Sequence, residues 1–497
     1  MGEYKTPGVY IKEKSAFGTS VVEVETAVPA FIGYTEKALN GTEDLTGKPW
    51  KITSMAEFIQ YFGGMRSPKY TIAAAGGDKP AEGSKSFAVD TYAGGEKRQF
   101  VIGVDNDFTL YLNMLLFFAN GGGPCYIVSV GSYDAEFKTA ALKDALTALE
   151  SESEPTMVVV PEAVNFPAAD CVALQQAVAE HCGEMQNRVA ILDVFIDRYP
   201  ADPTKTVDYP GGFRDQFTTN YPSYVAAYYP YLATSVLTQG DITNEMIAFG
   251  GDLNAFLSGL GLTDEQVAQL AKLSPDGTFT LGLHQALLQN SVAYAQLVKA
   301  ILDNLNLLPP SAAMAGVYAT TDKTRGVWKA PANVSINSIV KPYFTVNDYD
   351  QQDLNMPMSG KAINAIRTFP GEGLKVWGAR TLDGNSQDWR YVNVRRTMIY
   401  LEQSVKNAAR AYVFEPNDAN TWINMKCMIE NFLRSVWKRG GLAGAVPEDA
   451  YEVHVGLGDT MTGDDILEGI LRITVLVAVS HPAEFIEITF QQQMQKS

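Results

Sequence analysis

The sequence has few of the residues on which catalysis and metal binding commonly depend. Its 497 residues include only four cysteines and four histidines. The cysteines are irregularly spaced, and no two have the separation typical of a zinc-binding pair, so neither a disulfide framework nor a zinc site is expected. The histidines form no HExxH pair and neighbour no recognised nucleophile motif. We therefore expect no metal, no cofactor and no catalytic centre.

A phosphate-binding loop is also missing. The glycine-rich stretch 120–124 (NGGGP) is expected to follow a helix and precede a strand. A phosphate cradle needs the opposite order, with a helix N-terminus directed at the anion. No GKS or GKT follows any glycine-rich stretch. We interpret residues 120–124 as a helix C-cap and turn.

Positive charge is in short supply, because 39 lysines and arginines stand against 56 acidic residues, a formal net charge of −17. This balance argues against a nucleic-acid partner, which is bound through clustered basic residues. No apolar run is long enough to span a membrane, and the first residues, MGEYKTPGVYIKEK, contain no apolar signal core. We expect synthesis in the cytoplasm and no direct membrane insertion.

The apolar content, by contrast, is sufficient for sizeable cores: 46% of the residues are hydrophobic and 11% aromatic. The length predicts several domains. From Val28 to Tyr199, short β-prone runs alternate with helical patterns of about 10–15 residues, which is typical of layered α/β domains. The predicted fold class is mixed α/β and multidomain.

Composition divides the chain into four predicted parts. Residues 200 to about 312 change from a Tyr- and Pro-rich stretch to Ala- and Leu-rich helical patterns, and Lys69–Arg98 is predicted to be a surface loop or small insertion. The predicted parts are an N-terminal extended arm (1–25), an α/β domain (26–200), an inserted outer domain that is partly helical (201–315) and a C-terminal domain (316–497).

Both chain ends are predicted to be extended. Val9, Tyr10 and Ile11 belong to an alternating N-terminal segment. Near the other end, residues 484–491 place Ile486, Ile488 and Phe490 on one face of a strand, after a strand predicted to be fully buried at 472–479. An extended terminal segment with unpaired backbone groups suits strand addition to another chain's sheet. The alternative is that each segment pairs within its own domain.

Positive charge gathers in one part of this acidic chain. Between Arg390 and Gly440, nine basic residues stand against four acidic ones. Two amphipathic helices are predicted here, the second beginning at an Asn417 or Asp418 cap and ending at Gly440. Cations near a helix C-terminus are stabilising in any case. A second interpretation, compatible with the first, is a basic docking patch, for which the candidates are Arg434, Lys438, Arg439, Lys426 and Arg410.

Three stretches carry a family resemblance. They are VWGARTLDGNSQDWRYVNVRRTMIYLEQSVKNAARAYVFEPNDANTWINM from Val376, then FLRSVWKRGGLAGA, then HPAEFIEITFQQQMQ. In this order they resemble the C-terminal domain of contractile tail sheath proteins, which wrap the tube of contractile phage tails and phage-tail-like particles. The resemblance covers roughly residues 1–60 and 316–497. It implies a core shared by both chain ends, with extended terminal β-arms, the second at about 484–497.

The resemblance also implies a function. The chain is expected to be a structural subunit, not an enzyme, that polymerises helically around an inner tube and contracts to drive the tube through a target envelope. Expected partners are further copies in stacked rings, the inner tube protein on the basic patch, baseplate and terminal cap proteins, and sheath paralogues. Assembly is expected in the bacterial cytoplasm, into a phage-tail-like particle that is released or stays anchored in the cell.

Two other functions stay open at this point. The chain could serve as a specialised sheath paralogue at the baseplate or terminal end of the same machine. A soluble α/β enzyme of unknown reaction would require a pocket holding a titratable group with a perturbed pKa.

Overall fold

The computed structural model describes residues 21–74, 85–93, 95–105, 108–200, 202, 204–250, 252–274 and 276–488. The chain divides into two compact units. The larger is Glu25–Arg396, and the smaller combines Met1–Val24 with Thr397–Ser497. The predicted arm residues Val9, Tyr10, Ile11 and Phe490 lie outside the described residues. In the described part, no helix is both long and apolar enough to cross a membrane.

The larger unit is built on a mixed sheet in which nine described strands are joined in the order β15-β18-β17-β11-β10-β9-β1-β8-β4. Six of them, from β17 to β8, run parallel. β1 (PAFIGYT) is buried along its whole length, as expected of a parallel strand covered on both faces. The strands are β1 Pro29–Thr35, β4 Trp50–Ile52, β8 Cys125–Ser132, β9 Met157–Val159, β10 Val189–Asp193, β11 Val225–Tyr229, β15 Val334–Ser335, β17 Asn364–Phe369 and β18 Gly373–Trp377.

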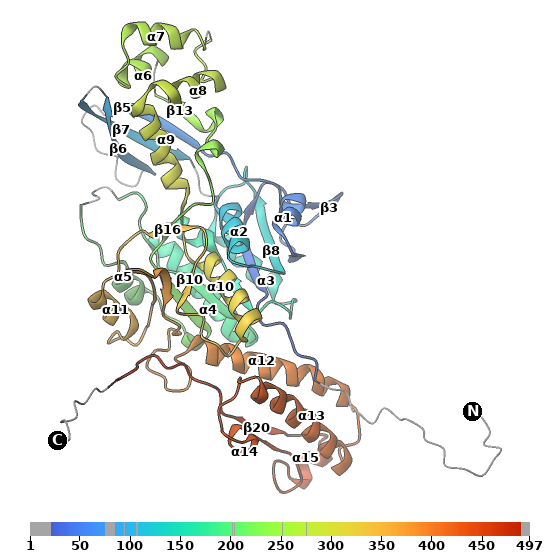
Figure 1. The fold of residues 1–497 in the computed structure, drawn as a ribbon. Helices are drawn as coiled ribbons and strands as arrows, with labels where there is room; N and C mark the ends of the chain where they lie inside the picture. The colour runs from blue at the N-terminus through green and yellow to red at the C-terminus, as the bar shows by residue number, and fades with distance from the viewer. Residues whose placement is uncertain are drawn as a thin grey trace, which may run out of the picture. The chain divides into compact units, whose positions relative to one another are not determined.

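Helices cover both faces of this sheet (Figure 1). The chain leaves β1 through α2 toward β8, and leaves β8 through α3 in the opposite direction toward β9. Right-handed crossovers in opposite directions place α2 and α3 on opposite faces. α10 packs on α2, and α4 packs on α3. The helices of this layer are α1 Met55–Phe62, α2 Leu110–Ala119, α3 Thr139–Leu149, α4 Ala168–Met185, α5 Tyr209–Gln216, α10 Ser311–Arg325 and α11 Asp348–Asn355.

A second sheet corrects the prediction for Lys69–Arg98. In their described part these residues are not a surface loop, because they supply β5, β6 and the start of β7, which with β13 form a sheet in the order β13-β5-β7-β6. The signal was the alternation that buries Tyr70, Ile72, Phe100 and Ile102. The strands are β5 Lys69–Ala74, β6 Ser86–Ala93, β7 Glu96–Asp105 and β13 Ile247–Phe249, accompanied by α6 Leu253–Gly259, α7 Asp264–Ala271, α8 Leu281–Asn290 and α9 Val292–Leu305.

The division of the chain differs from the predicted one at residue 316. β11, from the predicted inserted domain, pairs with β17, from the predicted C-terminal domain, through Tyr228↔Asn364. Residues up to Arg396 therefore belong to the larger unit. Two short sheets complete this unit: β14 Leu307–Leu308, β12 Leu232–Thr234 and β16 Ile339–Pro342 form one, and β2 Leu39–Asn40 and β3 Glu43–Asp44 the other.

The smaller unit packs helices on a short hairpin of β19 and β20. α13 begins as predicted, because the Asp418 side chain accepts hydrogen bonds from the Asn420 and Thr421 N–H groups. The prediction of a fully buried strand at 472–479 is wrong, since β20 alternates between exposed and half-buried residues. The elements are α12 Val392–Ala409, which crosses the boundary between the units, α13 Ala419–Lys438, α14 Pro447–Ala450, β19 Tyr451–His454, α15 Gly463–Leu467 and β20 Thr474–Val477.

Candidate functional site

The sheet of the larger unit has the topology that usually creates a ligand site. Its connections leave β1 and the adjacent β9 toward opposite edges, so the carboxyl ends of these two strands form a switch point. In many α/β proteins a ligand occupies this crevice. The space is filled here by the chain itself.

The occupant is Glu162, which is completely buried just after β9. Its carboxylate accepts hydrogen bonds from the backbone N–H groups of Tyr34 at 2.8 Å, Thr109 at 2.8 Å and Leu110 at 3.0 Å. Gly33 permits this approach, since a Cβ there would lie 2.6 Å from the Glu162 Oε2 atom. Burial raises the pKa of Glu162 to about 7, and the three N–H donors oppose that rise. The N-terminus of α2 is thus satisfied internally.

A second buried carboxylate satisfies α10 in the same way. Asp193, at the end of β10, accepts hydrogen bonds from the Ser311 N–H group at 2.7 Å and from the Ser311 hydroxyl at 2.5 Å. Burial raises the pKa of Asp193 to about 7. Neither helix N-terminus is left to bind a substrate anion.

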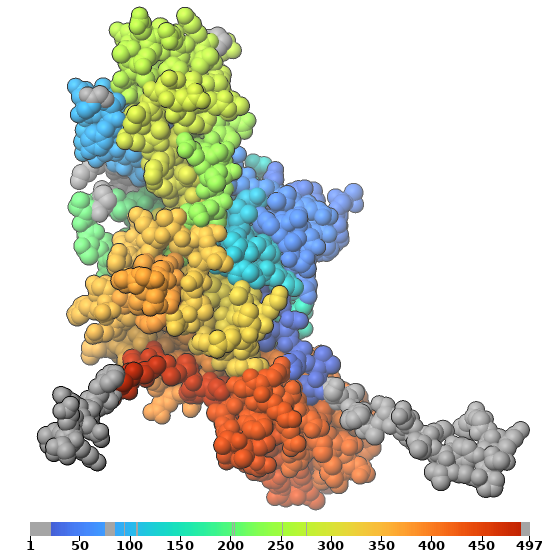
Figure 2. Space-filling view, in the orientation of Figure 1, coloured from blue at the N-terminus to red at the C-terminus, as the bar shows by residue number. Residues whose placement is uncertain are grey.

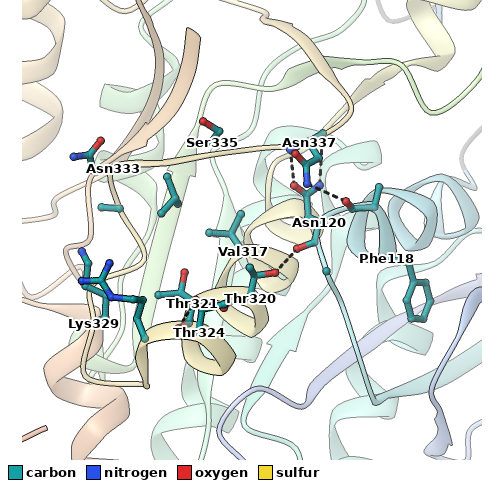
Figure 3. A pocket seen from close by; sticks show the side chains of 15 residues that line it. Phe118, Asn120, Val317, Thr320, Thr321, Thr324, Lys329, Asn333, Ser335 and Asn337 are labelled. Carbon is teal, nitrogen blue, oxygen red and sulfur yellow. Dashed lines mark hydrogen bonds between the residues drawn. The ribbon is translucent and has the colours of Figure 1, made fainter. Parts of the chain in front are cut away.

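A groove on the larger unit also lacks catalytic groups. It has a volume of about 620 Å³ and lies between α10, the end of α2 and the segment 332–337 (Figure 3). Its polar groups bond to one another: the Thr320 hydroxyl donates to the Asn120 backbone carbonyl, and the Asn337 backbone N–H group donates to the Asn120 side-chain oxygen. Its lining includes the cations Arg325 and Lys329 but no histidine, cysteine or carboxylate. The groove offers no acid–base pair.

Among the described residues, no group of three or more His, Cys, Asp or Glu side chains is placed to hold a metal ion. The buried His181 lies 3.2 Å from the Arg188 guanidinium. Burial and this cation lower the pKa of His181 to about 4, so the ring stays neutral. Arg188 itself donates to the Leu149 and Glu152 carbonyls just after α3, a structural role.

The smaller unit has strand edges that are unpaired over most of their length in the described residues. β19 and β20 pair only with each other as named strands in the described residues, so each has a free edge over most of its length. Beyond β20, the Ala443 N–H group donates to the Ala478 carbonyl. Leu476 of β20 is 53% exposed. A two-stranded sheet is marginally stable on its own, and its free edges are templates for added strands.

The predicted C-terminal arm does not close this sheet in its described part. Residues 484–488 belong to no strand, and Ile486 and Ile488 are 78% and 70% exposed. Two residues of the N-terminal segment, Glu23 and Val24, are bonded to the helices of the smaller unit. The Val24 N–H group donates to the Ser404 hydroxyl, and Glu23 forms a bidentate ion pair with Arg439 at 2.6 and 3.0 Å.

The five candidate docking cations have different surroundings. Arg434 donates to the Tyr451 hydroxyl at 3.3 Å, Lys426 lies 3.8 Å from Glu430, and Arg439 holds Glu23. Lys438 and Arg410 are exposed. Lys426, Arg434 and Lys438 follow one another at multiples of four residues along α13, so they lie along one side of it. Arg439 instead anchors the N-terminal segment, a contact that sequence spacing could not reveal.

Two other cations in the basic stretch are internal. Arg396 and Asp322 form an ion pair whose side chains are 3% and 5% exposed. Arg395 stacks on Trp389 and donates to the Ser223 hydroxyl. The excess of positive charge between Arg390 and Gly440 therefore overstates what is available at the surface.

The comparisons with known proteins agree with this arrangement. Residues 385–493 match the model of the phage tail sheath C-terminal domain. The fold is similar over 99% of both chains to the sheath of the extracellular contractile injection system PVC in its contracted state, with 26% identity and a TM-score of 0.58. It is similar over 99% of this chain and 100% of the other to the contracted helical sheath of the anti-feeding prophage (AFP), with 27% identity and a TM-score of 0.61. Residues 385–493 thus match a tail sheath domain, and the fold of the whole chain is similar to that of contractile injection system sheaths.

Sequence relatives are sheath proteins as well. The tail sheath protein of Vibrio phage KVP40 is 26% identical over 140 residues, which is 28% of this chain and 21% of the relative. A putative prophage major tail sheath protein of Pseudomonas aeruginosa is 32% identical over 90 residues, 18% of this chain and 23% of the relative. These matches span about a fifth of the relatives' length. The predicted mixed α/β fold class is confirmed. The family and fold neighbours of this chain are structural sheath proteins, not enzymes.

Proposed function

We propose that this chain is the sheath subunit of a contractile, phage-tail-like injection particle. The observation that carries the proposal is the open β19–β20 hairpin in the same unit as the matched sheath domain. A hairpin with two free edges accepts strands, and the chain has two terminal segments with which to donate them.

Strand exchange between copies would generate the assembly. A contact between different surfaces, repeated by a rotation that does not close, builds an open helix. Backbone hydrogen bonds in the added strands would hold neighbours together while the larger units rotate and repack around them, a rigid-body change between two packings. The extended packing is the metastable one in this scheme, so contraction needs no nucleotide. The described residues hold no metal-ligand group of three or more, and the groove beside α10 has no acid–base pair, which fits this scheme.

The finer partners belong to the same proposal. An inner tube protein would dock on the exposed cations of the smaller unit, of which Lys438 and Arg410 carry no ion pair among the described residues. The sheath would meet a baseplate at one end and a cap at the other. The chain would be made and assembled in the bacterial cytoplasm, and it would act from a particle like the extracellular contractile injection system PVC, one of its fold neighbours.

A specialised paralogue at the baseplate is the second candidate. A chain in the AFP baseplate is similar to this one, with 28% identity and a TM-score of 0.58 over 99% of this chain. Labelling the chain in intact particles separates the candidates: label along the whole sheath supports the main proposal, and label confined to one end supports the paralogue.

Negative-stain electron microscopy of the purified chain, alone and with its tube protein, tests assembly. Wide, hollow, helically striated cylinders are expected. Without the tube protein, these cylinders should have the contracted packing. A chain that stays monomeric in both conditions would contradict the proposal.

A further inference from the structure

One residue of the smaller unit combines full exposure with an unfavourable backbone conformation. Phe414, in the turn between α12 and α13, is 103% exposed and has a φ of +72°. Residues with large aromatic side chains rarely adopt a positive φ, and exposing an apolar side chain to water is unfavourable in free energy. The preceding Val413 is also exposed.

The surrounding structure holds this turn in place. The Asn417 side chain donates to the Ile470 carbonyl at 3.1 Å and accepts from the Trp422 indole N–H at 2.7 Å. Asp418 caps α13, and the Glu415 N–H group donates to the Tyr412 carbonyl. Strained residues persist where neighbours over-determine them, and they gather at functional sites. Phe414 is thus displayed rigidly to whatever covers it.

The location of the turn connects it to the open sheet. Ile470, which Asn417 holds, precedes the first residue of β20 by four positions. This contact ties the Phe414 turn to the segment that leads into β20, the strand whose edge the proposed function assigns to another copy. The exposed cations Lys406 and Arg410 lie on the same approach to the turn, at the end of α12 and in the turn that follows.

We propose that Phe414 is an anchor for the segment 485–488 (FIEI) of a second copy of the chain. This segment carries apolar side chains that its own copy leaves exposed, Phe485, Ile486 and Ile488. It also carries Glu487, which complements Arg410 in charge. Buried aromatic anchors dominate the energetics of many interfaces. The inference rests on the proposed function, because it specifies one contact in the assembly.

The substitution Phe414→Asn separates assembly from folding. Asparagine tolerates positive φ, so the thermal unfolding midpoint of the full-length chain is expected to stay the same or rise. The protein concentration needed for tube formation, measured by pelleting and electron microscopy, is expected to rise at least ten-fold. Phe414→Gly relieves the same strain and serves as a second variant. Tyr349→Asn, which removes an exposed aromatic from α11, is the control and is expected to change neither quantity.

The outcomes distinguish this inference from the proposed function. If wild-type protein forms tubes and Phe414→Asn forms them at the same concentration, the anchor is refuted and the sheath function stands. If Tyr349→Asn impairs assembly as strongly as Phe414→Asn, the specific role of Phe414 is refuted. If wild-type protein forms no tubes even with its tube protein, the proposed function itself fails.

The occupant is tested by cross-linking and by charge exchange. A photoreactive phenylalanine analogue at position 414, in tubes mixed from ¹⁴N- and ¹⁵N-labelled copies, is expected to link to the peptide containing residues 485–488 of the other copy. Arg410→Glu is expected to weaken assembly, and adding Glu487→Arg to the same chain is expected to restore it. Cross-links to the tube protein or to another segment, or failure of the exchange, would overturn this occupant.

Discussion

The two units of this chain differ in whether the backbone groups at helix ends and strand edges have hydrogen-bond partners within the chain. In the larger unit, the switch point of the sheet is filled by Glu162 and the N-terminus of α10 by Asp193. In the smaller unit, β19 and β20 keep free edges, and Phe414 is held in a strained, exposed conformation. The comparison teaches that the larger unit satisfies these groups internally, whereas the described part of the smaller unit leaves strand edges unpaired, where the proposed function places strands of other copies.

The largest expected effect comes from removing the C-terminal segment from the smaller unit. Deleting residues 486–497 should leave a folded protein, because the described part of this segment belongs to no strand of its own chain. Tube formation should be lost, since the donated strand is gone. Circular dichroism checks the fold and electron microscopy checks assembly. Tubes formed by the truncated chain would show that the segment is dispensable.

Glu162→Ala, in the larger unit, should reduce the stability of the folded chain. The substitution leaves three buried N–H groups without an acceptor, which should lower the free energy of unfolding by about 3–5 kcal/mol. Urea unfolding measures the change. Glu43→Ala, at an exposed ion pair, is the matched control and should cost less than about 1 kcal/mol. A loss as small as that of the control would mean that Glu162 does not close the switch point.

A pH dependence of moderate size follows from the same carboxylates. The pKa values of Glu162 and Asp193 are about 7 in the folded chain, above those of unfolded carboxyl groups. The folded state therefore binds protons that the unfolded state releases between about pH 4.5 and 7. These two groups should make the chain more stable as the pH falls through this window. Urea unfolding at several pH values, compared with Glu162→Gln, tests the direction; an unchanged slope in the variant would contradict the assignment.

The smallest expected effect concerns the base of the N-terminal segment. The Arg439–Glu23 pair is about 40% exposed on both sides, so Arg439→Ala should change stability by less than about 1 kcal/mol. A double-mutant cycle with Glu23→Ala measures the coupling.

Lys438→Ala should instead leave stability unchanged and weaken binding to the tube protein. If Arg439→Ala weakens tube binding as much as Lys438→Ala does, Arg439 is also part of the docking patch.

Much of the fold could be predicted from local patterns. The alternation of β-prone runs with helical patterns before Tyr199 predicted the layered α/β domain, and the expected Asn417 or Asp418 cap predicted the start of α13. The strands at 69–105 were missed because glycine, lysine and alanine dominate that composition, although Phe100 and Ile102 alternate. Burial of the strand at 472–479 was overestimated because its apolar run looked continuous, whereas its partner sheet has only two described strands.

The sites were harder to predict, because they depend on contacts between distant residues. The role of Glu162 requires Tyr34 and Thr109 to meet it across the sheet. The pairing of Arg439 with Glu23 joins residues more than 400 positions apart. The positive φ of Phe414 depends on the Asn417 contacts and has no signature in composition. The terminal strands stay predictions, because Val9, Tyr10, Ile11 and Phe490 lie outside the described residues and residues 484–488 belong to no described strand.

Hydrogen exchange of the chain before and after tube formation tests the contrast most directly. In the free chain, the β1 amides should be protected, whereas the outward-facing amides of β19 and β20 should exchange quickly. On assembly, we expect the β19 and β20 amides to become protected at both free edges while the β1 amides stay as they were. Edges that still exchange quickly in assembled tubes would contradict the account, because strand donation could not then hold the sheath together.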